Sequence, residues 1–216
     1  MQPSSPATTV LFVRHGETTL NVQGHFRGRA DPPLTVRGTA QARALGQALA
    51  AWRPTAILAS PRRRAVQTAA EIGSATSCEA EIDPRLDDID YGEWTGLPQS
   101  EVGVRWAEEF RRWRTAPETL TLPRGEAVAQ VAERIGGVVS DLASRSEGST
   151  IVVVTHDVTI RLMICRVLEA PLASMHRIRV GLASLTVVTT GNGVFIERMN
   201  DQRHLAALEG TPATDR

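Results

Sequence analysis

The segment Val10-Leu11-Phe12-Val13-Arg14-His15-Gly16-Glu17-Thr18 is the stretch from which we predict the fold. Four apolar residues bounded by polar residues and a glycine are typical of a buried strand. Arg14 and His15 follow that strand directly, where open α/β sheets bind their ligands. Gly16 allows a sharp turn and a close approach of the backbone to a bound group. A strand that ends in polar residues without any function would show the same pattern, so other parts of the sequence are needed to distinguish the two interpretations.

Composition and charge narrow the class of protein. The chain has 216 residues, 42% of them hydrophobic, and a formal net charge of zero. These values predict a single domain over residues 8–206, in which residues 97–122 could form a cap insertion. They argue against a nucleic-acid partner or a membrane-surface partner. We expect disordered termini at residues 1–7 and 209–216.

The cysteines and basic residues add two expectations. Cys78 and Cys165 are the only cysteines and show no metal-ligand spacing, and the first residues lack the pattern of a secretory signal. We therefore expect a cytoplasmic protein, either a monomer or a homodimer. All 24 basic residues besides histidine are arginines. Any basic side chain that binds a phosphate or carboxylate must therefore be a guanidinium or an imidazole group.

Alternating apolar and helical patterns predict an α/β fold, a three-layer α/β/α sandwich with a mainly parallel sheet. Gly191-Asn192-Gly193 predicts an antiparallel hairpin at the C-terminal end. Thr35 is expected to cap one helix, and Ser60, followed by Pro61, to cap the next. The predicted strands are 8–13, 56–59, 79–82, 150–155, 184–190 and 194–198; the predicted helices are 36–52, 62–72, 99–113, 126–143 and 159–168.

Three of the predicted strands end in residues suited to catalysis. Arg14-His15 follows the first, an arginine run at 62–64 follows the second, and His156 follows the strand 150–155. The carboxyl ends of parallel strands share one sheet edge, so these cations and imidazoles should converge. Guanidinium groups match phosphoryl oxygens in a bidentate way, and the helix near Ser60 could add its N-terminal amides. This edge is therefore expected to bind a phosphoryl group.

Six blocks of residues occur in order along the chain. They are Arg14-His15-Gly16-Glu17-Thr18, then Asn21, Gly28 and 31–38, Ser60 through Ala69 with Arg64, Leu86 through Gly96, Gly125-Glu126, and Thr155-His156. In these blocks the chain resembles the histidine phosphatase superfamily, also called phosphoglycerate mutase-like. The block around Asp88 and the ending near Asn200 and His204 resemble α-ribazole phosphatase and broad-specificity relatives within the phosphatase branch.

The resemblance implies that His15 attacks phosphorus while Arg14, Arg64 and His156 hold the phosphoryl oxygens. Asp88 stands where the family most often has Glu and would be the general acid and base. Asp87 and Asp90 remain rivals for that role. No metal and no cofactor are implied. Further phosphate contacts are expected from Asn21, Arg27, Gly28 and the backbone amide of Asp157, whose carboxylate should point away.

Several other residues are expected to have structural roles and no role in catalysis. We expect Arg62 and Arg63 to face solvent, and Trp94 to pack under the acidic loop. His25, His176 and His204 are expected in surface or loop positions. The helical aromatics of 99–113 are expected in core or lid packing.

The favoured function is a phosphomonoesterase that hydrolyses a small cytoplasmic phosphate ester through a phosphohistidine, at a mildly acidic optimum. One alternative is a 2,3-bisphosphoglycerate-dependent phosphoglycerate mutase, for which Arg105, Arg111, Arg112 and Arg114 could supply the extra basic residues. The other is a non-catalytic phospholigand-binding module. None of these motifs specifies the substrate itself.

Overall fold

A six-stranded sheet forms the centre of the computed structural model, which describes residues 7–145 and 148–209. β1 pairs in parallel with β4, β4 with β2, and β2 with β3, whereas β5 runs antiparallel to both β1 and β6. The predicted, mainly parallel sheet with a C-terminal hairpin is confirmed. Across the sheet the strands are β3 (Ala80–Ile82), β2 (Ala56–Ala59), β4 (Thr150–Thr155), β1 (Thr8–Arg14), β5 (Leu185–Thr190) and β6 (Val194–Asp201).

Residues 10–13 of β1 are all apolar because both faces of the sheet are covered. Val10 and Phe12 belong to the hydrophobic cluster on one face, and Leu11 and Val13 belong to the cluster on the other. Successive side chains of a strand point to opposite faces, so four consecutive apolar residues are needed to fill both. The polar residues that follow therefore leave the sheet at its edge.

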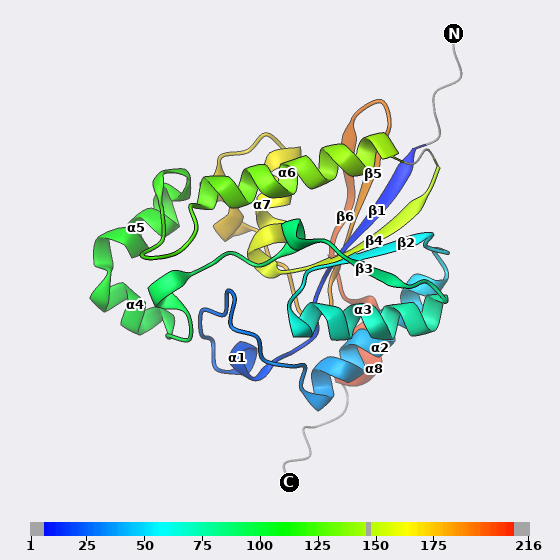
Figure 1. The fold of residues 1–216 in the computed structure, drawn as a ribbon, viewed down its shortest axis with the longest axis horizontal. Helices are drawn as coiled ribbons and strands as arrows, with labels where there is room; N and C mark the ends of the chain where they lie inside the picture. The colour runs from blue at the N-terminus through cyan, green and yellow to red at the C-terminus, as the bar shows by residue number, and fades with distance from the viewer. Residues whose placement is uncertain (1–6, 146–147, 210–216) are drawn as a thin grey trace.

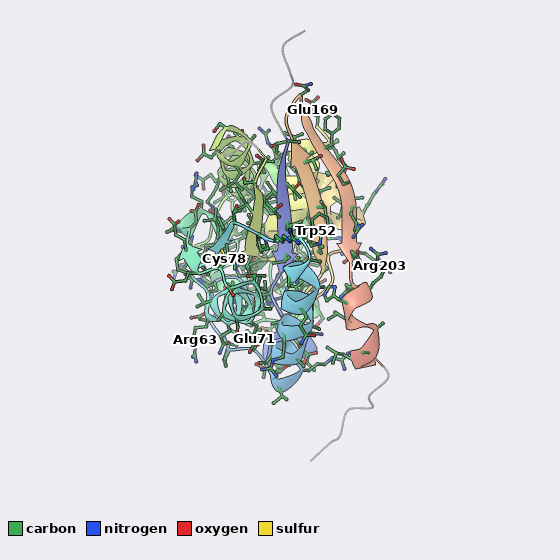
Figure 2. The ribbon with its side chains drawn as sticks, turned by 90° about the vertical axis from the view of Figure 1, so that its right-hand side faces the viewer. Trp52, Arg63, Glu71, Cys78, Glu169 and Arg203 are labelled. Carbon is green, nitrogen blue, oxygen red and sulfur yellow. The ribbon has the colours of Figure 1, made fainter. Side chains whose placement is uncertain are left out.

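Helices cover the two faces and give the predicted three-layer sandwich (Figure 1). One cluster contains side chains of α2 (Val36–Ala50) and α3 (Arg63–Thr76), with α8 (Ala206–Glu209) packed against it. The opposite cluster contains side chains of α6 (Val128–Arg145) and α7 (Asp157–Val167). In the turned view, α2 and α3 lie together beside the lower end of the sheet (Figure 2).

Residues 99–113 form two helices and not the single one predicted. α4 (Gln99–Arg105) and α5 (Ala107–Thr115) meet at Trp106, whose backbone leaves the helical region with φ −132° and ψ 54°. The Arg105 guanidinium stacks on the Trp106 ring at 4.4 Å. Periodicity alone could not show this break, because apolar spacing continues across it. Both helices lie to one side of the sheet (Figure 1).

Other element boundaries shift by a few residues. Thr35 caps α2 as predicted, accepting from the Gly38 backbone N–H at 3.0 Å. No helix is predicted before residue 36, yet the segment after β1 contains a short helix, α1 (Thr19–Val22). The expected disorder of the termini concerns residues that lie almost wholly outside the described ones, although Glu209 ends α8. The remaining short helices are 3-10 helices at Pro84–Leu86, Gly92–Trp94, Pro117–Thr119, Leu172–Arg177 and Arg203–Leu205.

Within residues 7–145 and 148–209, every helix falls short of the length and apolar character that a membrane crossing requires.

Candidate active site

Two histidines from neighbouring strands face each other at the sheet edge. His15 follows β1 and His156 follows β4, and their ring centroids lie 5.2 Å apart at an interplanar angle of 57°. β1 and β4 are paired in register up to Arg14 and Thr155, so the residues after them must be neighbours. Both rings are fully buried. The predicted convergence at this edge is therefore present.

The hydrogen bonds of His15 fix its tautomer. Nδ1 donates to the Gly16 carbonyl at 2.7 Å, and Nε2 accepts from Arg64 Nε at 3.2 Å. A carbonyl can only accept and a guanidinium can only donate. The proton of neutral His15 must therefore lie on Nδ1, and the lone pair of Nε2 faces the cluster.

Burial and nearby guanidiniums keep both imidazoles neutral. Burial lowers the pKa of His15 well below its usual range, and the charges of Arg64 and Arg14 lower it further. The pKa of His156 is lowered for the same reasons, burial first and Arg64 second. A protonated imidazole would add a positive charge among existing ones without water to solvate it. His15 is thus an unprotonated nitrogen base at neutral pH.

Arg64 links the nucleophile candidate to the acidic loop. Besides His15, its guanidinium donates to the carbonyls of Ala30 at 2.6 Å and Gly28 at 2.8 Å, and to Asp88 Oδ2 at 3.0 Å. The residue is fully buried on α3. Such a set of partners holds the guanidinium plane in one orientation beside His15 Nε2.

Asp88 is buried beside Arg64 and His156. Its Oδ2 is 3.0 Å from Arg64 and 3.7 Å from His156 Nδ1, and its Oδ1 accepts from the Ile89 N–H. Burial raises the pKa of Asp88, and Arg64 opposes that effect. The pKa is raised overall, because the residue is only 4% exposed.

The rivals of Asp88 are engaged elsewhere. Asp87 accepts two hydrogen bonds of 2.8 Å from Arg62, in a bidentate pair. Asp90 accepts from the Gly92 N–H at 2.9 Å and pairs with Arg29 at 3.2 Å. Both carboxylates therefore shape the acidic loop. Arg62 is half-buried in this pair, so its predicted exposure to solvent is wrong, whereas Arg63 is exposed on α3 (Figure 2).

Ser60 is a site residue that we did not single out for this role. Its Oγ lies 2.7 Å from His156 Nε2, and it does not cap α3 as predicted. α3 begins at Arg63, and the carboxylate of Asp31 accepts from the Arg63 N–H at 2.7 Å. That amide is therefore not available to a phosphoryl group. A serine at the end of a strand, facing the edge that carries His156, was the available signal.

Two glycines allow the turn after β1 to lie against the start of α2. A Cβ on Gly16 would come within 2.4 Å of the Gly38 carbonyl oxygen, and one on Gly38 would come within 2.1 Å of the Glu17 carbonyl oxygen. Gly16 N–H also donates to Thr68 Oγ1 at 3.1 Å. This close contact sets the direction in which His15 leaves the sheet.

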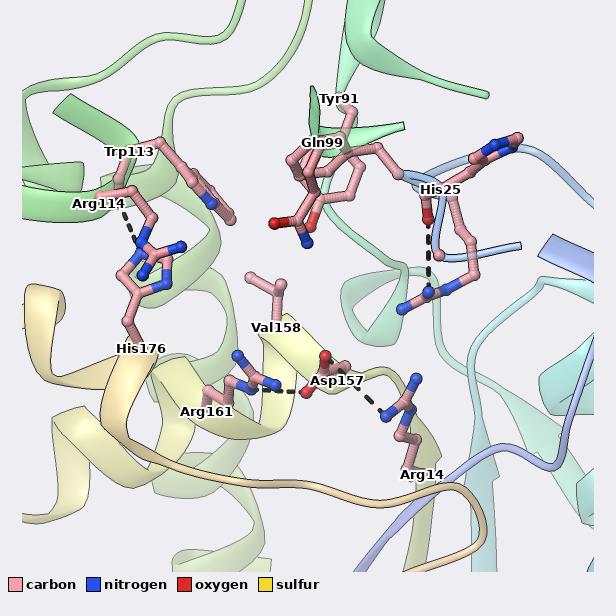
Figure 3. Close-up of a pocket in the computed structure, with 13 residues that line it drawn as sticks. Arg14, His25, Tyr91, Gln99, Trp113, Arg114, Asp157, Val158, Arg161 and His176 are labelled. Carbon is pink, nitrogen blue, oxygen red and sulfur yellow. Dashed lines mark hydrogen bonds and ion pairs between the residues drawn. The ribbon is translucent and has the colours of Figure 1, made fainter. Parts of the chain in front are cut away.

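A pocket of about 290 Å³ adjoins the cluster (Figure 3). Arg14 lines it, whereas His15, Arg64, Asp88 and His156 are buried beside it. Arg14 donates to the Val180 carbonyl at 2.5 Å, while its Nε has no hydrogen-bond partner among the described residues. Arg14 thus connects the pocket with the histidines, since it precedes His15 in the chain.

The structure places the four predicted phosphate-binding residues differently. Arg27 lines the pocket. The Asn21 side-chain oxygen instead accepts from the Thr18 N–H and hydroxyl, at 2.9 and 2.7 Å, where it closes the start of α1. Gly28 contributes its carbonyl to Arg64. It also lets the loop approach the acidic segment, because a Cβ there would come within 2.8 Å of the Ile89 carbonyl oxygen.

The expectation that the Asp157 carboxylate points away is wrong. It lines the pocket between two guanidiniums, with Arg14 Nη1 at 3.9 Å and Arg161 Nε at 2.6 Å (Figure 3). Asp157 is the first residue of α7, and Arg161 lies one turn further on. The i,i+4 spacing aligns the two side chains, and Arg14 attracts the second oxygen.

The remaining histidines and Trp94 have mainly structural contacts. Trp94 is fully buried under the acidic loop, as predicted. His204 lies 2.9 Å from the Ala183 carbonyl. His25 and His176 both line the pocket, so their predicted surface positions border the candidate site. His176 Nε2 lies 2.6 Å from the Trp113 carbonyl, and burial lowers the pKa of its ring.

Comparison with known proteins identifies the family. Residues 10–202 match the histidine phosphatase superfamily (branch 1). Phosphoserine phosphatase 1 of Hydrogenobacter thermophilus is 35% identical, over 83% of this chain and 85% of that protein. A protein named "Probable phosphoglycerate mutase GpmB" from Enterobacter sp. strain 638 is 30% identical, over 95% of this chain and 97% of that protein.

A solved structure agrees with this assignment. The α-ribazole phosphatase from Shigella flexneri is 26% identical and superposes with a TM-score of 0.80, covering 90% of this chain and 96% of that one. The resemblance to phosphatases of this kind is thereby confirmed. This chain belongs to the histidine phosphatase superfamily (branch 1) and is a phosphoric monoester hydrolase of that family.

Proposed function

We propose that the protein hydrolyses a small cytoplasmic phosphate ester through a phosphohistidine on His15, with Asp88 as general acid and base. The observation that carries this proposal is the tautomer of His15. Its Nδ1 proton is held by the Gly16 carbonyl, so Nε2 presents a lone pair beside Arg64 and His156. A neutral imidazole so oriented is a nucleophile that needs no further base.

The first step transfers the phosphoryl group to the enzyme. His15 Nε2 forms a bond to phosphorus while the bond to the ester oxygen breaks, and Asp88 gives its proton to the leaving oxygen. Burial favours the protonated form of Asp88 that this step requires. Arg14, Arg64 and His156 stabilise the charge on the phosphoryl oxygens. A phosphoryl oxygen takes the place of His15 as acceptor for Arg64 Nε once Nε2 is bonded.

The second step regenerates the enzyme. The Asp88 carboxylate removes a proton from water, the water oxygen attacks phosphorus, and the bond to His15 Nε2 breaks. Phosphate leaves, and Asp88 is again protonated. Arg27, at the pocket wall, and the Asp157 backbone N–H, at the start of α7, are additional phosphate contacts in this proposal. Residues 8–206 act as one domain, with 97–122 as a cap.

Hydrolysis of 4-nitrophenyl phosphate by the purified protein tests this function, with a chelator present and His15→Ala in parallel. We expect turnover that resists the chelator and disappears in the variant. Turnover that survives in His15→Ala, or that is lost with the chelator, would contradict the mechanism.

A phosphoglycerate mutase is the second candidate, because a relative of that name matches nearly the whole chain. Isomerisation of 3-phosphoglycerate in the presence of 2,3-bisphosphoglycerate, with little hydrolysis, would favour it. Binding of phosphate without turnover of any ester would instead favour a phospholigand-binding module.

A further inference from the structure

The loop that carries Asp88 has no helix or strand of its own. Residues 87–91 connect the 3-10 helix Pro84–Leu86 to the one at Gly92–Trp94, and the segment runs from β3 to α4 beneath α6 in Figure 1. A loop of this kind pairs its backbone polar groups with donors and acceptors from other elements. Those partners therefore determine where the Asp88 carboxyl lies relative to His15 and the pocket.

Arg134, a half-buried residue of α6, donates to two carbonyls at the start of this loop. Its Nη1 lies 2.6 Å from the Arg85 carbonyl oxygen and 2.8 Å from the Asp87 carbonyl oxygen. The second carbonyl belongs to the peptide bond between Asp87 and Asp88, so this hydrogen bond acts on the backbone from which the Asp88 side chain projects. A guanidinium is always charged in proteins, and hydrogen bonds from charged donors are the stronger ones.

Glu126 orients the Arg134 guanidinium. Both of its carboxylate oxygens accept from Arg134 Nη2 at 3.2 Å. One of them also accepts from the Asp90 N–H at 3.3 Å, and the Glu126 N–H donates to the Asp90 carbonyl at 2.9 Å. The glycine before Glu126 permits this contact, because a Cβ on Gly125 would come within 2.4 Å of the Asp90 carbonyl oxygen. Arg134 and Glu126 together thus hold the loop on both sides of Asp88.

Two threonines attach the same loop from other elements. Thr155 of β4 donates to the Leu86 carbonyl at 2.7 Å, and Thr159 of α7 donates to the Asp87 carbonyl at 3.4 Å, which is long for a hydrogen bond. Loss of the Arg134 side chain should therefore leave the loop attached, with the peptide bond after Asp87 less firmly held.

We propose that Arg134, oriented by Glu126, is a positioning residue for proton transfer by Asp88. The inference rests on the proposed role of Asp88 as general acid and base, and it assigns the residues that keep the carboxyl in place. Neither Arg134 nor Glu126 is among the described residues that line the pocket, so both must act through the loop. The Asp88 carboxyl has to reach the leaving oxygen, and a misplacement of about 1 Å can cost about 10²-fold in rate.

Two aryl esters of similar shape measure proton transfer separately from binding. Phenolate is a more basic leaving group than 4-nitrophenolate, so hydrolysis of phenyl phosphate depends more on the acid. kcat/KM reports the first step, in which Asp88 gives up its proton. We expect Arg134→Met to lower kcat/KM for phenyl phosphate roughly 10- to 100-fold, as for a displacement of about 1 Å. For 4-nitrophenyl phosphate the loss should stay below about threefold, because that leaving group needs little help from an acid.

Companion variants separate positioning from stability. Arg134→Lys should recover part of the phenyl phosphate activity, since an ammonium can still donate to the carbonyls but lacks the planar fork that pairs with Glu126. Glu126→Gln should show a smaller loss of the same kind, because its amide oxygen can still accept from the guanidinium. Arg85→Met is the matched control. It removes a 2.5 Å ion pair with Asp141 that joins the same 3-10 helix to α6, and it should affect both esters equally.

A double-mutant cycle tests whether Arg134 acts through Asp88. Asp88→Asn removes the acid, so there is no proton transfer left for Arg134 to position. Adding Arg134→Met to Asp88→Asn should therefore lower kcat/KM for phenyl phosphate by less than about threefold more, whereas independent effects would multiply. Thermal midpoints from circular dichroism, measured for every variant, show that the compared proteins are folded at the assay temperature.

The outcomes distinguish this inference from the proposed function. If Asp88→Asn loses phenyl phosphate hydrolysis selectively but Arg134→Met affects both esters equally, the inference is overturned and the acid role of Asp88 stands. Losses that multiply in the double variant would also overturn it. Equal losses for both esters in Asp88→Asn would overturn the acid role, and this inference with it. Should Arg134→Met fail to fold, Arg134→Lys and Glu126→Gln provide the same comparison, and equal losses for both esters in these two variants would overturn the inference.

Discussion

The substitution Asp88→Asn tests the general-acid role of Asp88 separately from the other parts of the mechanism. The amide keeps the size of the side chain and its contact with Arg64, which is 3.0 Å from Oδ2, but it has no proton to give. General acid catalysis typically contributes about 10²- to 10⁴-fold. We expect a loss of that size in kcat/KM for an alkyl phosphate, whose leaving oxygen needs the proton.

An aryl phosphate should respond differently to the same substitution. 4-Nitrophenolate leaves as a stable anion, so its kcat/KM should fall less than about tenfold, which is below the usual contribution of an acid. The second step still lacks its base, so Asp88→Asn should show a burst of about one nitrophenolate per enzyme followed by slow turnover. Stopped-flow absorbance measures the burst, and a phosphate-release assay measures the alkyl ester.

Asp87→Asn is the matched control, since both carboxylate oxygens of Asp87 accept hydrogen bonds from Arg62. It should affect both esters alike and show no burst. Equal losses for alkyl and aryl esters in Asp88→Asn would refute the acid role. A selective loss for the alkyl ester in Asp87→Asn would transfer the role to that residue.

Three further predictions concern stability and positioning. Burial lowers the pKa of His15 and of His156 in the folded state, so below the usual histidine pKa of about 6.5 the unfolded chain binds more protons than the folded one. The thermal midpoint should therefore fall as the pH drops from about 7 to 5. A midpoint that does not change over this range would argue against buried neutral imidazoles. Gly28→Ala should lower the unfolding free energy by more than Gly24→Ala, because Gly28, at φ +48°, also has no room for a Cβ. At Gly24, with φ +70° and open space around it, only the backbone strain of about 1 to 3 kcal/mol applies. Equal urea midpoints for the two variants would contradict this. Ser60→Ala removes the 2.7 Å contact to His156 and should therefore lower the unfolding free energy by about 1 kcal/mol and reduce kcat. An unchanged kcat would show that this contact does not position the His156 ring.

The sheet and its edge could be predicted because a few strong local patterns specify them. The apolar run of β1 and that of β4 are long enough to identify strands, and parallel pairing then brings His15 and His156 together. Arg64 and Asp88 were proposed from motif order, and the structure places them 3.0 Å apart. Their chemical roles stay predictions until they are measured.

Contacts between segments distant in sequence were beyond local patterns. The contact of the Asp157 carboxylate with Arg14 and the hydrogen bond from the Arg63 N–H to Asp31 both join residues from different segments of the chain. Ser60 looked like a helix cap because serine before proline usually is one. It lies instead beside His156, which the one-dimensional pattern could not indicate.

The most direct test of the central claim is to trap the phosphoenzyme. Acid is unsuitable because a phosphorus–nitrogen bond is labile in it, so the reaction with an excess of ester is stopped with alkaline denaturant and analysed by intact mass and peptide mapping. The account predicts one phosphoryl group on His15 that is stable to base, lost in acid and absent in His15→Ala, with accumulation enhanced in Asp88→Asn. Turnover without such an adduct in Asp88→Asn, or a phosphoryl group on another residue, would contradict it.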